Sequence, residues 1–331
     1  MKNIWKEGVF GVVVGDALGC PVQFESREKV AGHPVTGMRG QGTFNLPAGS
    51  WTDDSSLTLA LLESIGRTGK MDLKDIMGNF EEWLEHGAFT PYGYAYDIGF
   101  GTEQAIQSYM KSGNPFECGG RLASNNGNGS LMRIMPACLY CYAKGMDDGE
   151  AIRAIHAVGS LTHAHIRSNI ACGLYFFMIR SVLDGEGSLQ ERMQAGLDRG
   201  FAYYEKTLED PAELRYYDRI RDLMSFAQVP AEEIRGSGYV VETLEAVAWA
   251  LVTTGSFEEA LLKVVNLGQD TDTTGAITGG LAALYYGYDA IPTAWIEAIQ
   301  KKEWIGELCE KAEQAAGSLT EYLCPGIKKT E

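Results

Sequence analysis

The stretch Asn266-Leu-Gly-Gln-Asp270-Thr-Asp272-Thr273-Thr-Gly-Ala276 places two carboxylates and a hydroxyl just ahead of a helix-like run. A second stretch far upstream, Ser50-Trp-Thr52-Asp53-Asp54-Ser55, has a matching composition. Carboxylate and hydroxyl oxygens are hard ligands of the kind that Mg²⁺ and Mn²⁺ take in octahedral geometry. If both stretches meet in one pocket, their four negative charges repel strongly unless cations lie between them. Together the two stretches predict a divalent-metal site.

Each of these acidic stretches is followed by a helical pattern. After Asp54 the apolar and small residues share one helical face, and after Thr273 that face is formed by Gly275, Ala276, Gly279, Gly280 and Ala283. A glycine inside a helix costs about 1 kcal/mol relative to alanine, so three of them predict close approach by another backbone or a ligand. The alternative is that Asp and Thr are simply helix N-caps. A cap needs one such residue and each stretch has three, so we favour the metal.

The first predicted helix, residues 6–18, carries glycines every three or four positions, at Gly8, Gly11, Gly15 and Gly19. This pattern predicts close packing against another helix. A dinucleotide fingerprint is excluded because it needs a preceding strand, which the sequence lacks.

Composition sets the broad class. The 331 residues are 45% hydrophobic and 22% charged, as is normal for a globular protein. No apolar run is as long as the roughly 18–20 residues that a membrane-spanning helix needs. The net charge of −16 argues against nonspecific nucleic-acid binding and against an anionic membrane surface. Seven scattered cysteines and the lack of a signal-peptide pattern favour free thiols in a reducing compartment. We expect a cytoplasmic monomer.

Helical periodicity runs through the whole chain, and alternating strand patterns, internal repeats and low-complexity linkers are absent. The sequence therefore predicts an all-α fold, a single compact multi-helix domain over residues 1–325 with its active-site loops at one end. A short polar tail is expected at 326–331.

Three loops are candidate ligand-binding segments. The Tyr- and Gly-rich residues 90–102 could shape a pocket or form a packed loop. The Gly- and Asn-rich residues 119–131, leading into a helix predicted from Met132, could present backbone N–H groups to a phosphate, although they lack the lysine of a P-loop. The pair His163 and His165 is weak evidence for zinc without a further ligand nearby, so a ligand contact or a loop histidine is preferred.

Taken together and in this order, the motifs resemble those of the ADP-ribosylglycohydrolases, a family that includes the hydrolase that reactivates dinitrogen reductase. The resemblance rests on Gly15-Asp-Ala-Leu-Gly19 with Glu25, Trp51-Thr-Asp-Asp54, Asp97-Ile-Gly99, Asn128-Gly-Ser-Leu-Met-Arg133, Thr162-His163, Gly268-Gln-Asp-Thr-Asp-Thr273, and Ile291-Pro292 with Trp295.

The resemblance implies two Mg²⁺ or Mn²⁺ ions held by Thr52, Asp53, Asp54, Asp270, Asp272 and Thr273. It implies an ADP-ribosylated protein or small molecule as substrate. Its phosphates and riboses would be held by Gly99, Gly101, Asn128, Gly129, Ser130, Met132 and Arg133, with His163 near the adenosine side. For proton transfer, members of the family point to an acidic residue at either Glu25 or Asp97, and we retain both.

The implied reaction is hydrolysis of an N- or O-glycosidic bond at ribose C1, which passes through an oxocarbenium-like transition state. Vicinal ribose hydroxyls are themselves hard oxygen donors that metal ions can hold. One alternative is a non-catalytic ADP-ribose-binding or structural protein on the same fold. Another is an α-helical Mg²⁺-dependent diphosphate enzyme of the isoprenoid type, but Leu57 stands where such an enzyme needs an aspartate. The sequence leaves open which side chain carries the ADP-ribose.

Overall fold

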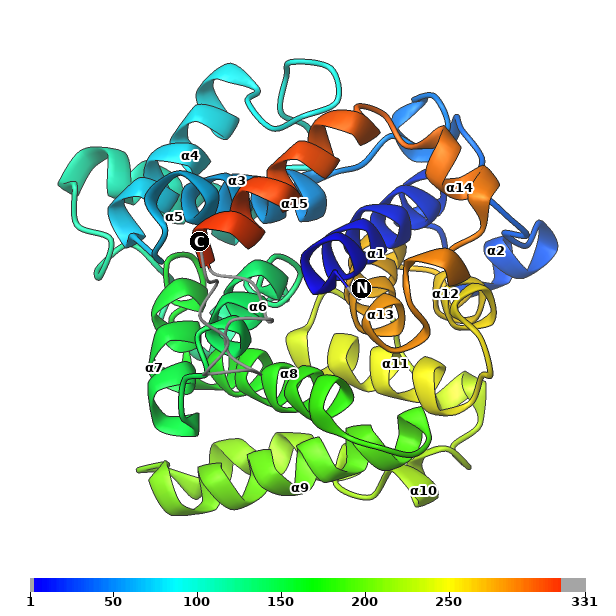
Figure 1. Ribbon diagram of the computed structural model, residues 1–331. Helices are drawn as coiled ribbons and strands as arrows, with labels where there is room; N and C mark the ends of the chain where they lie inside the picture. Colours follow the sequence, from blue (N-terminus) through cyan, green and yellow to red (C-terminus); the bar gives the residue numbers. More distant parts are fainter. Residues whose placement is uncertain (1–2, 317–331) are drawn as a thin grey trace, which may run out of the picture.

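The computed structural model describes residues 3–316, and this part of the chain has the predicted all-α fold (Figure 1). The predicted tail, 326–331, and the predicted domain end at 325 lie outside the described residues. Extended pairing in residues 3–316 is limited to three isolated bridges, Gln41 with Leu46, Gly120 with His163 and Gly127 with Tyr239. None of the helices in residues 3–316 is long and apolar enough to span a bilayer.

The α-helices are α1 (Ile4–Gly19), α2 (Arg27–Gly32), α3 (Asp53–Thr68), α4 (Leu73–His86), α5 (Phe100–Ser112), α6 (Met135–Ala143), α7 (Asp148–Gly159), α8 (Ile166–Asp184), α9 (Leu189–Thr207), α10 (Leu223–Phe226), α11 (Val240–Val252), α12 (Phe257–Val265), α13 (Thr271–Tyr286), α14 (Thr293–Ala298) and α15 (Lys302–Ala316). The 3₁₀ segments are η1 (Cys20–Val22), η2 (Gly42–Phe44), η3 (Ala123–Asn125), η4 (Pro211–Ile220), η5 (Ala231–Glu233) and η6 (Tyr288–Ala290).

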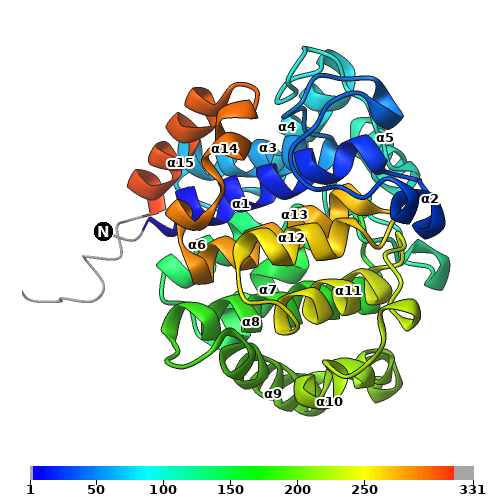
Figure 2. The same cartoon turned by 90° about the vertical axis from the view of Figure 1, so that its right-hand side faces the viewer.

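Helices α1 and α13 pack against each other at the centre of the molecule (Figure 1 and Figure 2). A Cβ atom on Gly15 would lie 2.0 Å from the carbonyl oxygen of Gly275, and one on Gly11 would lie 2.2 Å from that of Gly279. Gly19 faces Thr271 in the same way, so the helices run antiparallel. Most glycines of the two stripes thus form the two sides of one backbone contact. Gly8 and Gly280 instead face the side chain of Met135 in α6.

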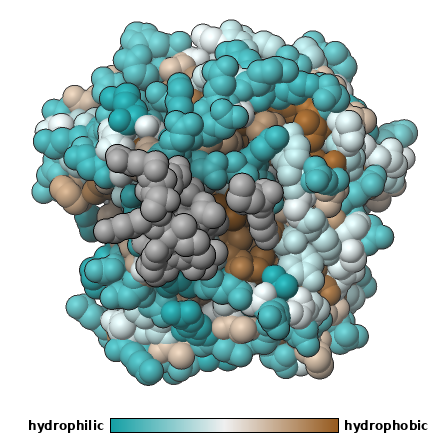
Figure 3. All heavy atoms as spheres, in the orientation of Figure 1, coloured by the Kyte–Doolittle hydropathy of each residue, from teal (hydrophilic) through white to brown (hydrophobic). Residues whose placement is uncertain are grey.

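The central helices are buried on almost every side. Helices α1, α8, α11 and α13 carry apolar or small residues around most of their circumference, as expected for helices inside a core. Helices α9, α12 and α15 are amphipathic and bury one face against this centre, whereas the amphipathic helix α4 packs against α3. Figure 3 shows one face of the molecule, on which hydrophilic residues predominate.

The Gly- and Asn-rich loop differs from the predicted arrangement. Residues 129–133 form turns, and helix α6 begins at Met135 rather than at the predicted Met132. The reason is Pro136, which lacks a backbone N–H and is therefore tolerated only in the first turn of a helix. The free backbone N–H groups at the start of α6 are therefore separated from the Gly- and Asn-rich loop by these turns.

We predict that Gly15→Ala strongly destabilises the protein. The added methyl group would overlap the Gly275 carbonyl, and two buried backbones cannot separate without opening the core. Overpacking of this kind costs about 3 kcal/mol or more. The control is Gly78→Ala in α4, where an added Cβ meets no atom within 4 Å. There the higher helix propensity of alanine should raise the free energy of unfolding by roughly 0.5–1 kcal/mol. Denaturant unfolding measures both, and equal stability of the two variants would contradict the close contact.

Candidate active site

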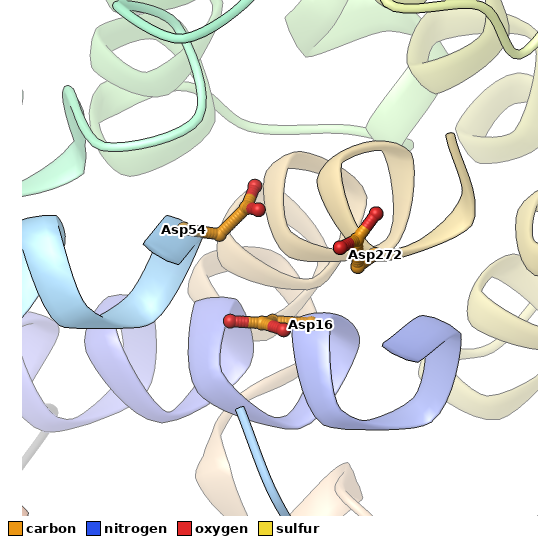
Figure 4. A group of neighbouring side chains, drawn as sticks. All are labelled: Asp16, Asp54 and Asp272. Atoms are coloured by element: carbon orange, nitrogen blue, oxygen red, sulfur yellow. The ribbon is translucent and has the colours of Figure 1, made fainter. Parts of the chain in front are cut away.

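Three carboxylates from distant parts of the chain meet at the ends of three helices (Figure 4). Asp16 comes from the last turn of α1, Asp54 from the first turn of α3 and Asp272 from the first turn of α13. One oxygen of each lies within 4.8 Å of the others, and all three residues are buried. The two acidic stretches therefore converge as the sequence predicts, and the α1–α13 contact adds a third carboxylate.

Asp16 acts as the N-cap of α3 from another helix. Its carboxylate accepts from the backbone N–H groups of Thr52 and Ser55, each at 3.0 Å, and from the Ser55 hydroxyl at 2.5 Å. Thr52 occupies the N-cap position but its side chain makes no capping hydrogen bond. Because Asp16 satisfies the helix end, the Thr52 hydroxyl is free to face the carboxylates.

The Thr52 hydroxyl is surrounded by acceptors. Its oxygen lies 3.0 Å from Asp16 Oδ1, 3.2 Å from Asp54 Oδ2 and 3.4 Å from Asp272 Oδ2. One hydroxyl proton can serve only one of them, so oxygen lone pairs face one another at the remaining contacts. Such an arrangement suits a cation that takes these oxygens as ligands.

A single unpaired atom supports the same reading. Asp54 Oδ1 is buried and has no hydrogen-bond partner among the described residues, whereas the Thr273 hydroxyl lies 3.3 Å from Asp54 Oδ2. A buried carboxylate oxygen without a donor is costly, and a divalent ion would satisfy it. By contrast, the oxygens of Asp16 already accept several hydrogen bonds. Asp54 is thus better suited to bind a metal directly, and Asp16 to hold Thr52 in place.

The other two predicted metal ligands, Asp53 and Asp270, line the adjoining cavity. Asp270 Oδ2 accepts a hydrogen bond of 2.6 Å from the side-chain amide of Asn128, which also donates to the Thr243 hydroxyl at 3.0 Å. Asn128 therefore orients a predicted metal ligand, in addition to lining the space where a substrate would lie.

Burial and mutual repulsion disfavour the charged forms of the acidic cluster. Burial raises the pKa of Asp16 to about 7, although hydrogen bonds from Ser55 and Thr52 act in the opposite direction. Burial, followed by the neighbouring Asp97 charge, raises the pKa of Asp53 and of Asp272 well above the ordinary value. The pKa of Asp54 is raised by burial and then by Asp16. Positive charge placed among these carboxyl groups would lower their pKa values and favour the charged forms.

A cavity of about 510 Å³ opens beside the cluster. Its lining includes the predicted residues Asp53, Asp97, Gly99, Gly101, Asn128, Gly129, Met132, His163, Asp270 and Thr273. A second cavity of about 360 Å³ adjoins it and shares His163 and Gly101. The loops carrying these residues are far apart in sequence, and the fold gathers them around one space.

Glycines at this cavity make room for His163. A Cβ on Gly129 would lie 2.7 Å from His163 Cε1, and one on Gly101 would lie 3.3 Å from Nε2. His163 Nδ1 lies 2.9 Å from the Thr162 hydroxyl, leaving Nε2 toward the cavity. Burial and the charge of Arg133 lower the pKa of His163 to about 3, so the imidazole is neutral at physiological pH.

Two predicted substrate-binding residues lie behind the cavity wall instead of lining it. Ser130 is buried beside the thiol of Cys172. Arg133 is fully buried, donates to the Thr162 hydroxyl at 2.8 Å and lies 4.8 Å from the centre of the Phe80 ring. In this arrangement Arg133 acts through Thr162 on His163 and makes no direct contribution to the cavity surface.

The two candidate proton-transfer residues occupy different environments. Asp97 lines the cavity, accepts a hydrogen bond of 2.8 Å from Gln23, and has a pKa raised by burial. Glu25 is absent from the cavity lining and pairs with Lys29 at 2.9 Å. Asp97 is therefore in the better position to contact a bound substrate in this conformation.

Three residues with unfavourable backbone conformations line the same cavity. Phe24, Asp97 and Gln269 all have left-handed φ angles, of 66°, 54° and 68°, and all three line it. Left-handed conformations of residues other than glycine are uncommon and cluster at functional sites. The sequence analysis assigned no role to Phe24, Gln269 or Asp16. Asp16 could have been recognised, because a lone aspartate among the apolar residues of α1 indicates a buried polar role.

Comparison with known proteins settles the family. A profile described as ADP-ribosylglycohydrolase matches residues 5–321. The chain belongs to the ADP-ribosylglycohydrolase family. It is 30% identical over 306 residues to the ADP-ribosylarginine hydrolase Tri1 of Serratia proteamaculans, covering 92% of this chain and 78% of that protein.

Further relatives of this ADP-ribosylglycohydrolase agree in sequence and structure. The ADP-ribosyl-[dinitrogen reductase] glycohydrolase of Rhodospirillum rubrum is 30% identical over 297 residues, with 88% of each chain covered. A solved structure of an ADP-ribosylglycohydrolase-related protein complex superposes with a TM-score of 0.76 and 29% identity, over 95% of this chain and 98% of the other. The protein is thus a glycohydrolase enzyme, and the isoprenoid alternative is wrong.

The electrostatics of the cluster predict how the metal-free ADP-ribosylglycohydrolase responds to pH. A carboxyl group whose pKa is higher in the folded chain favours folding while it is protonated, and this contribution is lost as pH rises through the folded pKa. For Asp16 this stabilising contribution is lost as the pH rises from 3.8, the ordinary pKa, to about 7, the pKa in the folded chain. Asp272→Asn removes one of the repelling charges, so the melting temperature of this variant in chelator should exceed that of wild type by about 2 °C near pH 8.

The matched measurement is the same comparison near pH 4, where protonation has already removed much of the repulsion and the difference should shrink. Melting curves followed by circular dichroism in chelator give both values. An Asp272→Asn variant that is less stable than wild type at pH 8 would show that the cluster is not under electrostatic tension.

Proposed function

We propose that this ADP-ribosylglycohydrolase is a divalent-metal-dependent enzyme that removes ADP-ribose from a modified protein side chain or small molecule. The bond cleaved is an N- or O-glycosidic bond at ribose C1. The observation that carries the proposal is the buried, unpaired Asp54 Oδ1 beside the crowded Thr52 hydroxyl, at the edge of a cavity large enough for a nucleotide-sized ligand.

The residues suited to hold two Mg²⁺ or Mn²⁺ ions are those predicted from the sequence, Thr52, Asp53, Asp54, Asp270, Asp272 and Thr273, with Asp16 in support. When bound, such ions supply positive charge that offsets the carboxylates and orients hydroxyl oxygens of a ribose. Asp16 holds the Thr52 hydroxyl toward them through the cap of α3, and Asn128 holds Asp270.

The remaining residues would bind the substrate and move protons. The neutral His163 offers Nε2 to the cavity, and the backbone of Gly99, Gly101 and Gly129 allows close approach by phosphate or ribose groups. Asp97, with its raised pKa, can exchange a proton with water or with the leaving group near the cluster. We propose Asp97 as the acid–base residue in preference to Glu25, which is paired with Lys29.

Two further expectations accompany this function. The free cysteines among residues 3–316 are all buried, which fits a reducing compartment such as the cytoplasm. The net charge of −16 supports the absence of a nucleic-acid partner. A monomeric state remains an expectation, which sedimentation would test.

The direct test is incubation of the protein with ADP-ribosylarginine and ADP-ribosylserine peptides, with Mg²⁺, Mn²⁺ or chelator. We expect ADP-ribose release with at least one substrate, and loss of release in chelator that is restored by metal. No release from any ADP-ribosyl linkage, combined with tight ADP-ribose binding, would establish the non-catalytic binding protein instead.

Metal binding should require both acidic stretches. We expect Asp54→Ala and Asp270→Ala each to lower Mn²⁺ affinity by at least tenfold, measured by calorimetry or by paramagnetic resonance of free Mn²⁺. Asp75→Ala in α4 is the control, because that carboxylate pairs with Arg67 in the last turn of α3, whereas Asp54 lies in the first turn of that helix. Unchanged Mn²⁺ stoichiometry and affinity in both site variants would refute this ligand set.

The proton-transfer assignment predicts unequal effects of two isosteric substitutions. Asp97→Asn should lower kcat by about 10²–10⁴-fold, the usual contribution of a positioned acid or base, while Glu25→Gln should have a smaller effect. Steady-state rates on the substrate that wild type cleaves decide between them. A larger loss in Glu25→Gln would reverse the assignment, and losses below about threefold in both would refute it for both.

A further inference from the structure

Two exposed phenylalanines stand at the cavity. Phe24 is 67% exposed and Phe100 is 73% exposed, yet both line the space beside the acidic cluster. Single exposed apolar side chains are ordinary on protein surfaces. Two large rings at the opening of one cavity that holds the candidate active site need a further reason, because neither ring is stabilised there by burial.

The backbone at Phe24 is held in place against its own preference. Its φ of 66° is unfavourable for a bulky side chain and costs about 1–3 kcal/mol. Two hydrogen bonds of 2.7 Å maintain it, from Phe24 N–H to the Gln269 carbonyl and from Gln269 N–H to the Glu25 carbonyl. Gln269 immediately precedes Asp270, so the position of the Phe24 ring is tied to the acidic stretch.

The segment that carries Phe100 is joined to the same structure. Phe100 is the first residue of α5, and Asp97 lies just ahead of it. The Gln23 side chain donates to Asp97 Oδ2 at 2.8 Å, linking the segment before Phe24 to the segment before Phe100. The two rings therefore belong to two connected segments at the cavity that carries Asp97.

The ionisable side chains that line this cavity are carboxyl groups and one imidazole. Asp53 and Asp97 line the cavity together with the two rings, and neither lysine nor arginine is among its lining residues. Aromatic faces and carboxylates both attract cations, and a guanidinium over a phenyl ring gains about 0.5–2 kcal/mol. A neutral hydroxyl-type acceptor would gain little from either.

We propose that Phe24 and Phe100 form a cation-binding entrance that holds the guanidinium side chain of an arginine carrying the ADP-ribose. The inference rests on the proposed function, and it names two residues that would make the enzyme favour an arginine-linked over a serine-linked modification. The ADP-ribose occupies the cavity, ribose C1 lies toward the acidic cluster, and the guanidinium beyond C1 meets the two rings and Asp97. The guanidinium keeps its positive charge when one of its nitrogens is glycosylated.

The test compares cleavage of matched ADP-ribosylarginine and ADP-ribosylserine peptides by wild type, Phe24→Leu and Phe100→Leu. Leucine keeps the apolar bulk but removes the aromatic face. Each substitution should lower kcat/KM for the arginine peptide by about 2–30-fold, as the cation–π range implies, and should change kcat/KM for the serine peptide by a smaller factor. Phe24→Tyr, which keeps the aromatic face, should retain wild-type selectivity.

Affinity for free ADP-ribose, which has no guanidinium, should stay within twofold in the leucine variants. Phe116→Leu is the matched control, because Phe116 is also 67% exposed but does not line the cavity, and its selectivity should equal that of wild type. An equal loss on both peptides, or a loss of ADP-ribose affinity, would overturn the cation-binding role.

The proposed function can fail separately. If wild type cleaves neither peptide nor any other ADP-ribosyl linkage, hydrolysis is refuted, and calorimetry then tests the entrance by itself. In that case wild type should bind ADP-ribosylarginine peptide more tightly than ADP-ribosylserine peptide, and Phe24→Leu should remove the difference. Equal binding of the two peptides by wild type would refute the entrance.

Discussion

The contact between the backbones of α1 and α13 determines where the chemistry lies. Side chains larger than hydrogen at Gly15 or Gly275 would separate the two helices, and with them the carboxylates on the neighbouring turns. Antiparallel packing sets the last turn of α1 beside the first turn of α13, which brings Asp16 close to Asp272. The energy of a tightly packed core thus holds like charges together that would otherwise separate.

Helix α3 enters this arrangement through its N-terminus. Asp16 provides the hydrogen bonds that a capping side chain would normally supply, so Thr52 keeps its hydroxyl for the cluster. By capping α3, Asp16 therefore leaves the Thr52 hydroxyl available to the carboxylate cluster. No basic side chain among residues 3–316 forms an ion pair with Asp54 or Asp272, and the raised pKa values of both carboxyl groups reflect their burial and the repulsion from neighbouring carboxylates. Divalent cations would relieve this repulsion.

The cavity combines this rigid acidic centre with strained loops. The left-handed residues Phe24, Asp97 and Gln269 stand around one opening, and each is fixed by hydrogen bonds to a neighbouring segment or by its place in the wall. Strain of this kind persists only where the surroundings over-determine it. The family relationship explains the acidic centre, while the two exposed rings concern the part of the substrate that extends beyond ADP-ribose.

The sequence by itself determined the all-α class and the helices that follow the acidic stretches, and it indicated the carboxylates and hydroxyls that are candidate metal ligands. These depend on local periodicity and on residue types that change little with context. The sequence also showed that two glycine stripes must each pack closely, but pairing them with each other required the fold. Only the tertiary structure decided that Asp16 joins the cluster, that Arg133 lies behind His163, and that Phe24 stands at the opening. Each of these depends on which segments meet across long separations in the chain, and side-chain direction at such contacts is set by packing, which no local pattern encodes.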